Sequence, residues 1–342
     1  MIECTRDLQS IKYRKLLSAF FDTYEKVKEF HGFEHEAKMI KDFELKLLEE
    51  CLGLTLAEHI ERPMRASLAV SFIDEKYRDH FIHSFQDFLT GLLVIDRFYE
   101  DFSTWYSTSL NNEINSSIEC AWLLTTLFHD HERDFPTITK FVDEEPKLPR
   151  RLRDRAKCTQ YAKDLSSVYD HLNAGKPLDT WASSNGTSPP SALATLLLDQ
   201  LDNLNHGVVG AFSLLSYDLQ ETIHPSLVYS SALAIAFHDR GPREDLLAQH
   251  VFPISMRRFP LAALLLYCDA VQEWDRSRLV SEQLVDIKLG QASSKHVIFV
   301  IHFGSAHSNK LKAEEFESVD RCICDNPIKL GFESSIIIGQ NQ

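Results

Sequence analysis

Residues 121–130 read AWLLTTLFHD and join an apolar helix to a polar end. Apolar side chains dominate from about Ile118 to Phe128, which predicts a buried helix that stops at the pair His129–Asp130. Neighbouring side chains cannot share one helix face, but at a helix end both can turn toward one ion, or Asp can bridge two. The pair is therefore a candidate metal site, although it could simply interact with the helix dipole.

Further segments with helical periodicity surround this one. A turn-rich stretch at 173–192 interrupts them and is expected to be a surface loop or lid, since apolar helices resume directly after it. The expected helices are 8–56, 77–99, 192–204, 207–215, 226–237 and 260–274. The sequence therefore predicts a mainly α protein.

The tail of the chain changes character. Three β-branched runs, LVDIKLGQ (284–291), HVIFVIHFG (296–304) and ESSIIIGQ (333–340), are typical of strands, and 310–322 reads as a helix. The order predicts a small β-β-α-β unit from about 284 to 342, as in a ferredoxin- or ACT-like half-domain.

Bulk composition narrows the class of protein. The 342 residues carry 36 basic and 50 acidic side chains, a formal charge of -14, which argues against duplex nucleic acid as a partner. The beginning, MIECTRDLQS, lacks an apolar signal core, and apolar runs such as 261–268 are shorter than the roughly 20 residues of a membrane span. The seven cysteines show no disulfide framework. We expect a cytoplasmic protein with no membrane partner; a homo-oligomer stays open.

Histidine and aspartate also recur in the other apolar helices. Asp269 interrupts the run PLAALLLYCDAVQEW (260–274), where an ionised carboxylate is costly unless it is paired or bound to metal. Taken singly, each has an ordinary reading: a His can be a core or surface residue, and Asp269 could pair with Arg276. Together they are the neutral imidazoles and carboxylates that Fe, Mn, Zn or Mg sites use.

In this order the motifs resemble the HD superfamily of metal-dependent phosphohydrolases. The resemblance covers about 70–280 and implies an HD-domain-like helical bundle. It divides the chain into an N-terminal helical region (1–69), the metal-binding helical domain (70–283) and the small C-terminal α/β unit (284–342). The motifs that carry it are RDHFIHSFQDFLTG (78–91), AWLLTTLFHD (121–130), NHGVVGAFSLL (205–215), ALAIAFHD (232–239) and LLLYCDAVQEW (264–274).

By similarity to the binuclear members of the superfamily, two divalent ions (Mn, Fe, Mg or Zn) are expected. The first would take His83, His129, Asp130 and Asp269, and the second would take Asp130 as a bridge, His206 and His238. Whether His80 or His83 is the first ligand is open, and we prefer His83 because Ser84 follows it. His131 and Glu132 replace the usual Ile-Gly continuation and no Gly-Tyr-Pro signature follows His238, so the cyclic-dinucleotide subfamily is not supported.

The resemblance implies hydrolysis of a phosphate ester, with a nucleotide as the expected small substrate, by metal-activated hydroxide. Asp130 would be catalytic, with His80 or His131 as proton donor. Arg78, Arg133, Arg240 and Arg276 flank the motifs and could bind phosphate, although surface salt bridges are the simpler reading. Asp239 would orient a neighbour or contact a helix end.

Two alternatives stay open. The domain could be a non-catalytic or regulatory HD domain that binds a nucleotide-like ligand, which the broken His-Asp-Ile-Gly motif and the ACT-like tail mildly favour. The helices could also be a scaffold without a metal site.

Overall fold

The computed structural model describes residues 15, 17–20, 22–23, 33–53, 80–107, 118–130, 148–176, 192–217, 219, 223–239, 245–248, 251–271, 284–289, 296–303, 306–327 and 329–336. Within these ranges the protein is mainly helical, as predicted. The helices are α3 (Phe33–Leu52), α5 (His80–Arg97), α6 (Tyr99–Ser107), α7 (Ile118–His129), α9 (Arg155–Asn173), α11 (Ala192–Asp202), α12 (His206–Leu215), α13 (Pro225–His238), α15 (Pro260–Val271) and α16 (Ala306–Arg321), with a short 3-10 helix, η1 (Arg150–Leu152).

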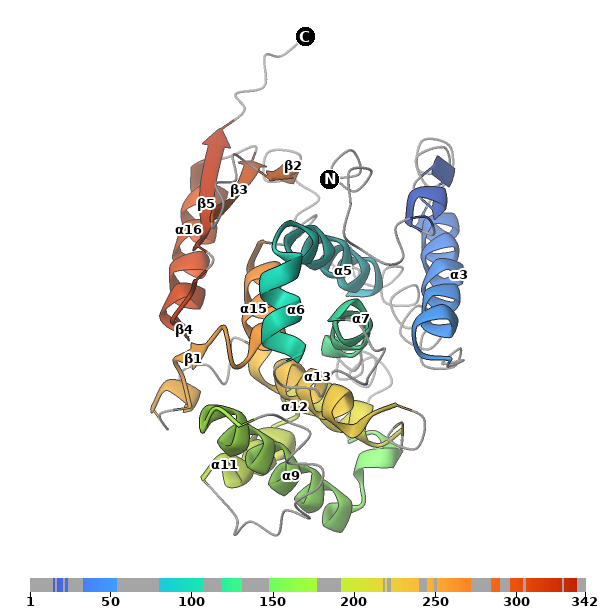
Figure 1. Ribbon diagram of the computed structural model, residues 1–342, viewed down its shortest axis with the longest axis vertical. Coiled ribbons are helices and arrows are strands. Elements are labelled where there is room, and N and C mark those ends of the chain that lie inside the picture. The colour runs from blue at the N-terminus through green and yellow to red at the C-terminus, as the bar shows by residue number, and fades with distance from the viewer. Residues whose placement is uncertain are drawn as a thin grey trace, which may run out of the picture.

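Helix α7 is the centre of the bundle. All of its side chains are buried, and α5, α12, α13 and α15 pack against it. Figure 1 shows α7 enclosed by its neighbours, with α3 along one side and α9 and α11 at one end. The Trp122 indole links α7 to α5 by donating a hydrogen bond to the carbonyl of Phe88 over 2.9 Å. The fully buried helix α7 therefore anchors the fold.

Two helices, α6 and α9, were not expected from the sequence. Residues 131–160 read as a polar stretch, yet α9 begins at Arg155. The Asp154 side chain caps it by accepting hydrogen bonds from the amides of Ala156 and Lys157. One face of α9 packs on α11 and α13 while the other is charged and exposed. The polar majority of its residues hides this amphipathic pattern.

The tail has the predicted β-β-α-β order. Strands β2 (Leu284–Leu289), β3 (His296–Phe303) and β5 (Lys329–Ile336) form a sheet in the order β2-β3-β5. The pair β2–β3 is antiparallel, and β3–β5 is parallel with α16 as the connection between them. The third strand begins at Lys329 rather than at Glu333, because the preceding segment 329–332 (KLGF) also pairs with β3.

The tail is attached to the helical bundle. Strand β4 (Ile323–Cys324), after α16, pairs in parallel with β1 (Ile254–Ser255), just before α15. The Tyr267 hydroxyl of α15 donates a hydrogen bond to Asp320 over 2.6 Å and accepts one from the Asn326 amide over 3.0 Å. The boundaries at 69 and 283 stay predictions.

Two further expectations concern membranes and thiols. Across the described ranges, every helix is too short or too polar to cross a bilayer. Five of the described cysteines form no disulfide: Cys120, Cys158, Cys268, Cys322 and Cys324.

Candidate metal centre

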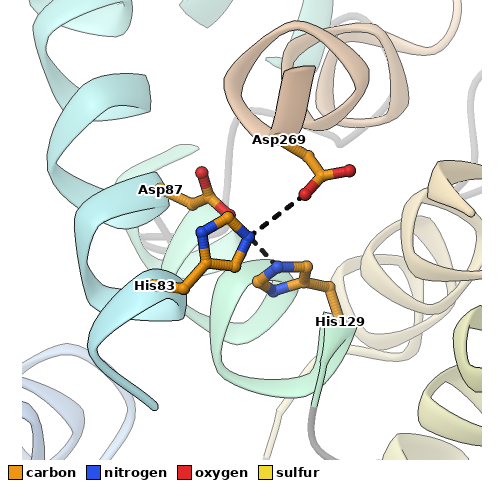
Figure 2. A group of neighbouring side chains, drawn as sticks. All are labelled: His83, Asp87, His129 and Asp269. Atoms are coloured by element: carbon orange, nitrogen blue, oxygen red, sulfur yellow. Dashed lines mark hydrogen bonds and ion pairs between the residues drawn. The ribbon is translucent and has the colours of Figure 1, made fainter. Parts of the chain in front are cut away.

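Three helices bring histidine and aspartate together beside the end of α7. His83 and Asp87 project from one face of α5, because side chains four residues apart lie one above the other on a helix. His129 is the last residue of α7, and Asp269 lies on α15. Figure 2 shows these four side chains pointing toward a common centre. We call His83, Asp87, His129 and Asp269 group 1.

The donor atoms of group 1 are spaced as ligands of one ion would be. Asp87 Oδ2 lies 3.2 Å from His83 Nε2 and 3.1 Å from His129 Nε2. Asp269 Oδ1 lies 3.1 Å from His83 Nε2. Metal–ligand bonds of about 2.1 Å at right angles place neighbouring donor atoms about 3.0 Å apart. The observed separations match that edge length.

A second set of donors lies next to the first. Asp130 follows α7, His206 begins α12, and His238 ends α13. The Nε2 atoms of His206 and His238 are 3.1 Å apart, and Asp130 Oδ1 is 3.4 Å from the first and 3.7 Å from the second. We call Asp130, His206 and His238 group 2; its donor atoms all lie within 4.8 Å of one another.

Asp130 faces both groups with different oxygens. While Oδ1 points to group 2, Oδ2 lies 3.8 Å from both His83 Nε2 and His129 Nε2 of group 1. This placement of its two oxygens would allow the carboxylate to bridge two cations.

Close helix packing makes this arrangement possible. A Cβ atom on Gly210 would lie 2.4 Å from the carbonyl oxygen of Phe128, and one on Gly207 would lie 2.9 Å from that of Ile235. Only glycine permits such contacts with the backbones of α7 and α13. The two glycines of NHGVVG therefore place His206 beside the ends of α7 and α13.

In three of the imidazoles, the outer nitrogen, Nδ1, which points away from the other donor atoms, contacts a hydrogen-bond acceptor. His129 Nδ1 lies 2.8 Å from the Thr126 carbonyl, and His238 Nδ1 lies 2.7 Å from the Ile235 carbonyl. His206 Nδ1 lies 2.9 Å from Asp239 Oδ2. Carbonyl and carboxylate oxygens only accept, so each Nδ1 must carry the hydrogen that it donates.

The inner nitrogens, Nε2, therefore carry lone pairs when the rings are neutral. In group 2, two such lone pairs face each other across 3.1 Å, which is repulsive without a proton or a cation between them. In group 1, the lone pair of His129 Nε2 faces the carboxylate of Asp87. The orientation of His206 by Asp239 is also the usual outer contact of a metal-binding histidine. The donor chemistry thus fits divalent cations in both groups.

The pKa values of His129 and Asp269 are shifted by the charged side chains that surround them. Burial is the largest influence on His129 and lowers its pKa, but the negative charges of Asp130 and Asp87 outweigh burial and raise that pKa to about 9. Burial raises the pKa of Asp269, but His83 and His238 bring it well below its usual value. Without metal, His129 therefore keeps a proton near neutral pH, while Asp269 stays ionised.

The structure brings together all six residues predicted as ligands, and their binding of metal stays a prediction. His83 lies at the centre, whereas His80 starts α5 with its side chain outside the described part. Asp239 contacts His206, in agreement with an orienting role. Five other predicted site residues lie outside the described ranges: Arg78, His131, Arg133, Arg240 and Arg276.

Sequence reasoning missed Asp87. Its two signals were available: it stands one helical turn after His83, and it lies among Phe85, Phe88 and Leu89 on an apolar helix. A carboxylate in that setting carries the same burial cost that singled out Asp269.

The chain matches no known family model, no curated protein and no solved structure. The likeness to HD proteins therefore depends on the order of the motifs and on the geometry of the centre.

Proposed function

We propose that this chain is a phosphohydrolase of the HD type that uses two divalent cations bridged by Asp130. Its expected substrate is a phosphate ester, with a nucleotide as the leading candidate. The observation that carries the proposal is that the two carboxylate oxygens of Asp130 face different groups of histidines. Its Oδ1 faces His206 and His238, and its Oδ2 faces His83 and His129.

The donor atoms suit divalent metal ions of intermediate softness. Four imidazoles and three carboxylates suit Mn, Fe or Zn better than Ca, which prefers oxygen alone. Two divalent cations beside three carboxylates leave one net positive charge when the imidazoles are neutral. The centre would then attract a phosphate although the whole chain carries a formal charge of -14.

A pair of bound divalent cations would supply Lewis acidity, lowering the pKa of a water and offsetting charge on phosphoryl oxygens. The chain contributes position and access. Asp130 and His238 are almost completely buried, at 1% side-chain exposure, whereas His206 and Asp269 are exposed by 19% and 15%. We infer that a substrate approaches from the side of His206 and Asp269.

The remaining residues of the proposed reaction stay predictions from the sequence. His80 or His131 would protonate the leaving group. Arg78, Arg133, Arg240 and Arg276 would be the candidates for phosphate binding.

Phosphate release from a panel of nucleotides tests the proposal. The protein is loaded with Mn²⁺ or Fe²⁺ and compared with Asp130→Asn, which should lose at least about 1,000-fold in rate because an amide offers one neutral oxygen and cannot bridge both cations. Asp42→Asn is the matched control, since this carboxylate is 62% exposed on α3, outside the metal groups. Metal-loaded protein that releases no phosphate, or an Asp130→Asn variant that keeps its activity, would contradict the proposal.

A second candidate is a regulatory HD domain that binds a nucleotide without turning it over. The contact of the tail with α15 favours it, because Tyr267 joins α16 to the helix that carries Asp269. Calorimetry with the same nucleotides separates the two: tight binding without release of phosphate supports regulation.

A further inference from the structure

The two metal groups differ in the number of side chains that surround each ion position. Group 1 has four side chains of its own, and Asp130 Oδ2 also faces it. Group 2 consists of three side chains, with Asp130 among them. Asp87 accounts for part of this difference, and the ligand set that the resemblance implies does not include it.

Asp87 is positioned as closely as any donor in group 1. Its Oδ2 is 3.1 Å and 3.2 Å from the two imidazole nitrogens, whereas Asp130 Oδ2 is 3.8 Å from each. The side chain is fully buried, and the pitch of α5 fixes it over His83. A buried carboxylate in this position is costly unless a positive charge meets it. Its place therefore suits a permanent cation.

The imidazoles of the two groups differ in their access to solvent. His83 and His129 of group 1 are 3% and 0% exposed, whereas in group 2 His238 is 1% and His206 is 19% exposed. The exposed donor of group 1 is the carboxylate of Asp269, at 15%. Protein metal sites that are saturated by side chains are generally structural, while sites with three protein ligands keep positions open for water or substrate.

We propose that Asp87 closes group 1 around a firmly held cation, and that group 2 holds an exchangeable cation whose open positions receive the phosphate of the substrate. This inference rests on the proposed binuclear centre. Its consequence is stepwise loading: a protein with one ion per chain contains the group 1 ion and is inactive until a second ion binds.

Staged removal of metal from the wild-type chain tests the inference. Protein saturated with Mn²⁺ is dialysed against a moderate chelator, and metal per chain is measured by mass spectrometry. We expect two ions before dialysis and one afterwards, with phosphate release lost and then restored by added Mn²⁺. Loss of both ions together, or retention of both, overturns the inference. Failure to bind any Mn²⁺ overturns the metal centre itself, and two bound ions without phosphate release overturn the proposed reaction alone.

Two matched variants assign the ions to their groups. Asp87→Asn should weaken binding of the retained ion by about 100-fold or more, so dialysis leaves less than one ion per chain. Asp239 contacts His206 and the Asn205 side chain and belongs to neither metal group, so Asp239→Asn should keep the retained ion and weaken the exchangeable one by about 10- to 100-fold. Circular dichroism checks the fold of each variant. An Asp87→Asn protein that folds and retains its ion through dialysis overturns the assignment.

Discussion

Metal-free protein should lose stability as the pH rises from about 6.5 to about 9. His129 is fully buried, and nearby carboxylates raise its pKa from 6.5 to about 9 against the opposing effect of burial. The folded state therefore binds a proton more tightly than the unfolded chain. The resulting stabilisation is fully present below pH 6.5 and is lost as the pH rises through 9.

The size of the effect follows from the shift. One pKa unit corresponds to about 1.4 kcal/mol, so His129 alone contributes about 3 kcal/mol at low pH. Unfolding entropy of about 2.1 cal/mol/K per residue, taken over 342 residues, converts this to a fall in Tm of about 4 to 5 °C.

Thermal unfolding between pH 6 and pH 9.5, with a chelator present, measures this slope. His129→Gln should flatten it, and His171→Gln on α9 should leave it unchanged. Added Mn²⁺ should stabilise the wild-type protein more at pH 9 than at pH 6, because the metal competes with protons for the same nitrogens. Equal slopes for wild type and folded His129→Gln would refute the reasoning.

Three further substitutions probe the helix contacts. Gly210→Ala should cost about 1–3 kcal/mol and weaken Mn²⁺ binding, because its Cβ would lie 2.4 Å from the Phe128 oxygen; unchanged urea unfolding and metal titration would argue against tight packing of α12. Tyr267→Phe should cost about 1–3 kcal/mol in urea unfolding, because a carboxylate and an amide both lose the hydroxyl; a neutral result would mean that the tail contributes little to α15. Asp154→Ala should cost about 0.5–2 kcal/mol by removing the cap of α9, and an equally stable variant would contradict that role.

The helical part of the fold was predictable where burial makes the periodicity strong. Helix α7 is apolar on every side, so its extent and its end at His129 follow directly from AWLLTTLFHD. The amphipathic helix α9 lacks that signal, since its exposed face is charged and its cap is a single residue, Asp154. The first half of β5, residues 329–332, was missed because its pairing with β3 depends on a strand more than twenty residues away in sequence.

The candidate site was predictable as a set of residues but not as a geometry. The cost of burying Asp269 singles it out from the sequence alone. Asp87 could have been found by the same reasoning, together with its spacing from His83. The pairing of His206 with Asp239 could not, because it depends on the close approach of α12 and α13 across residues distant in sequence. Likewise, only the docked helices reveal which oxygen of Asp130 faces which group.

Anomalous diffraction from crystals of the Mn²⁺-loaded protein tests the bridging role of Asp130 most directly. We predict two anomalous peaks about 3.5–4 Å apart, one beside His83, Asp87 and His129 and one beside His206 and His238, with an oxygen of Asp130 bound to each. A single peak, or two peaks that Asp130 does not join, would contradict the binuclear centre.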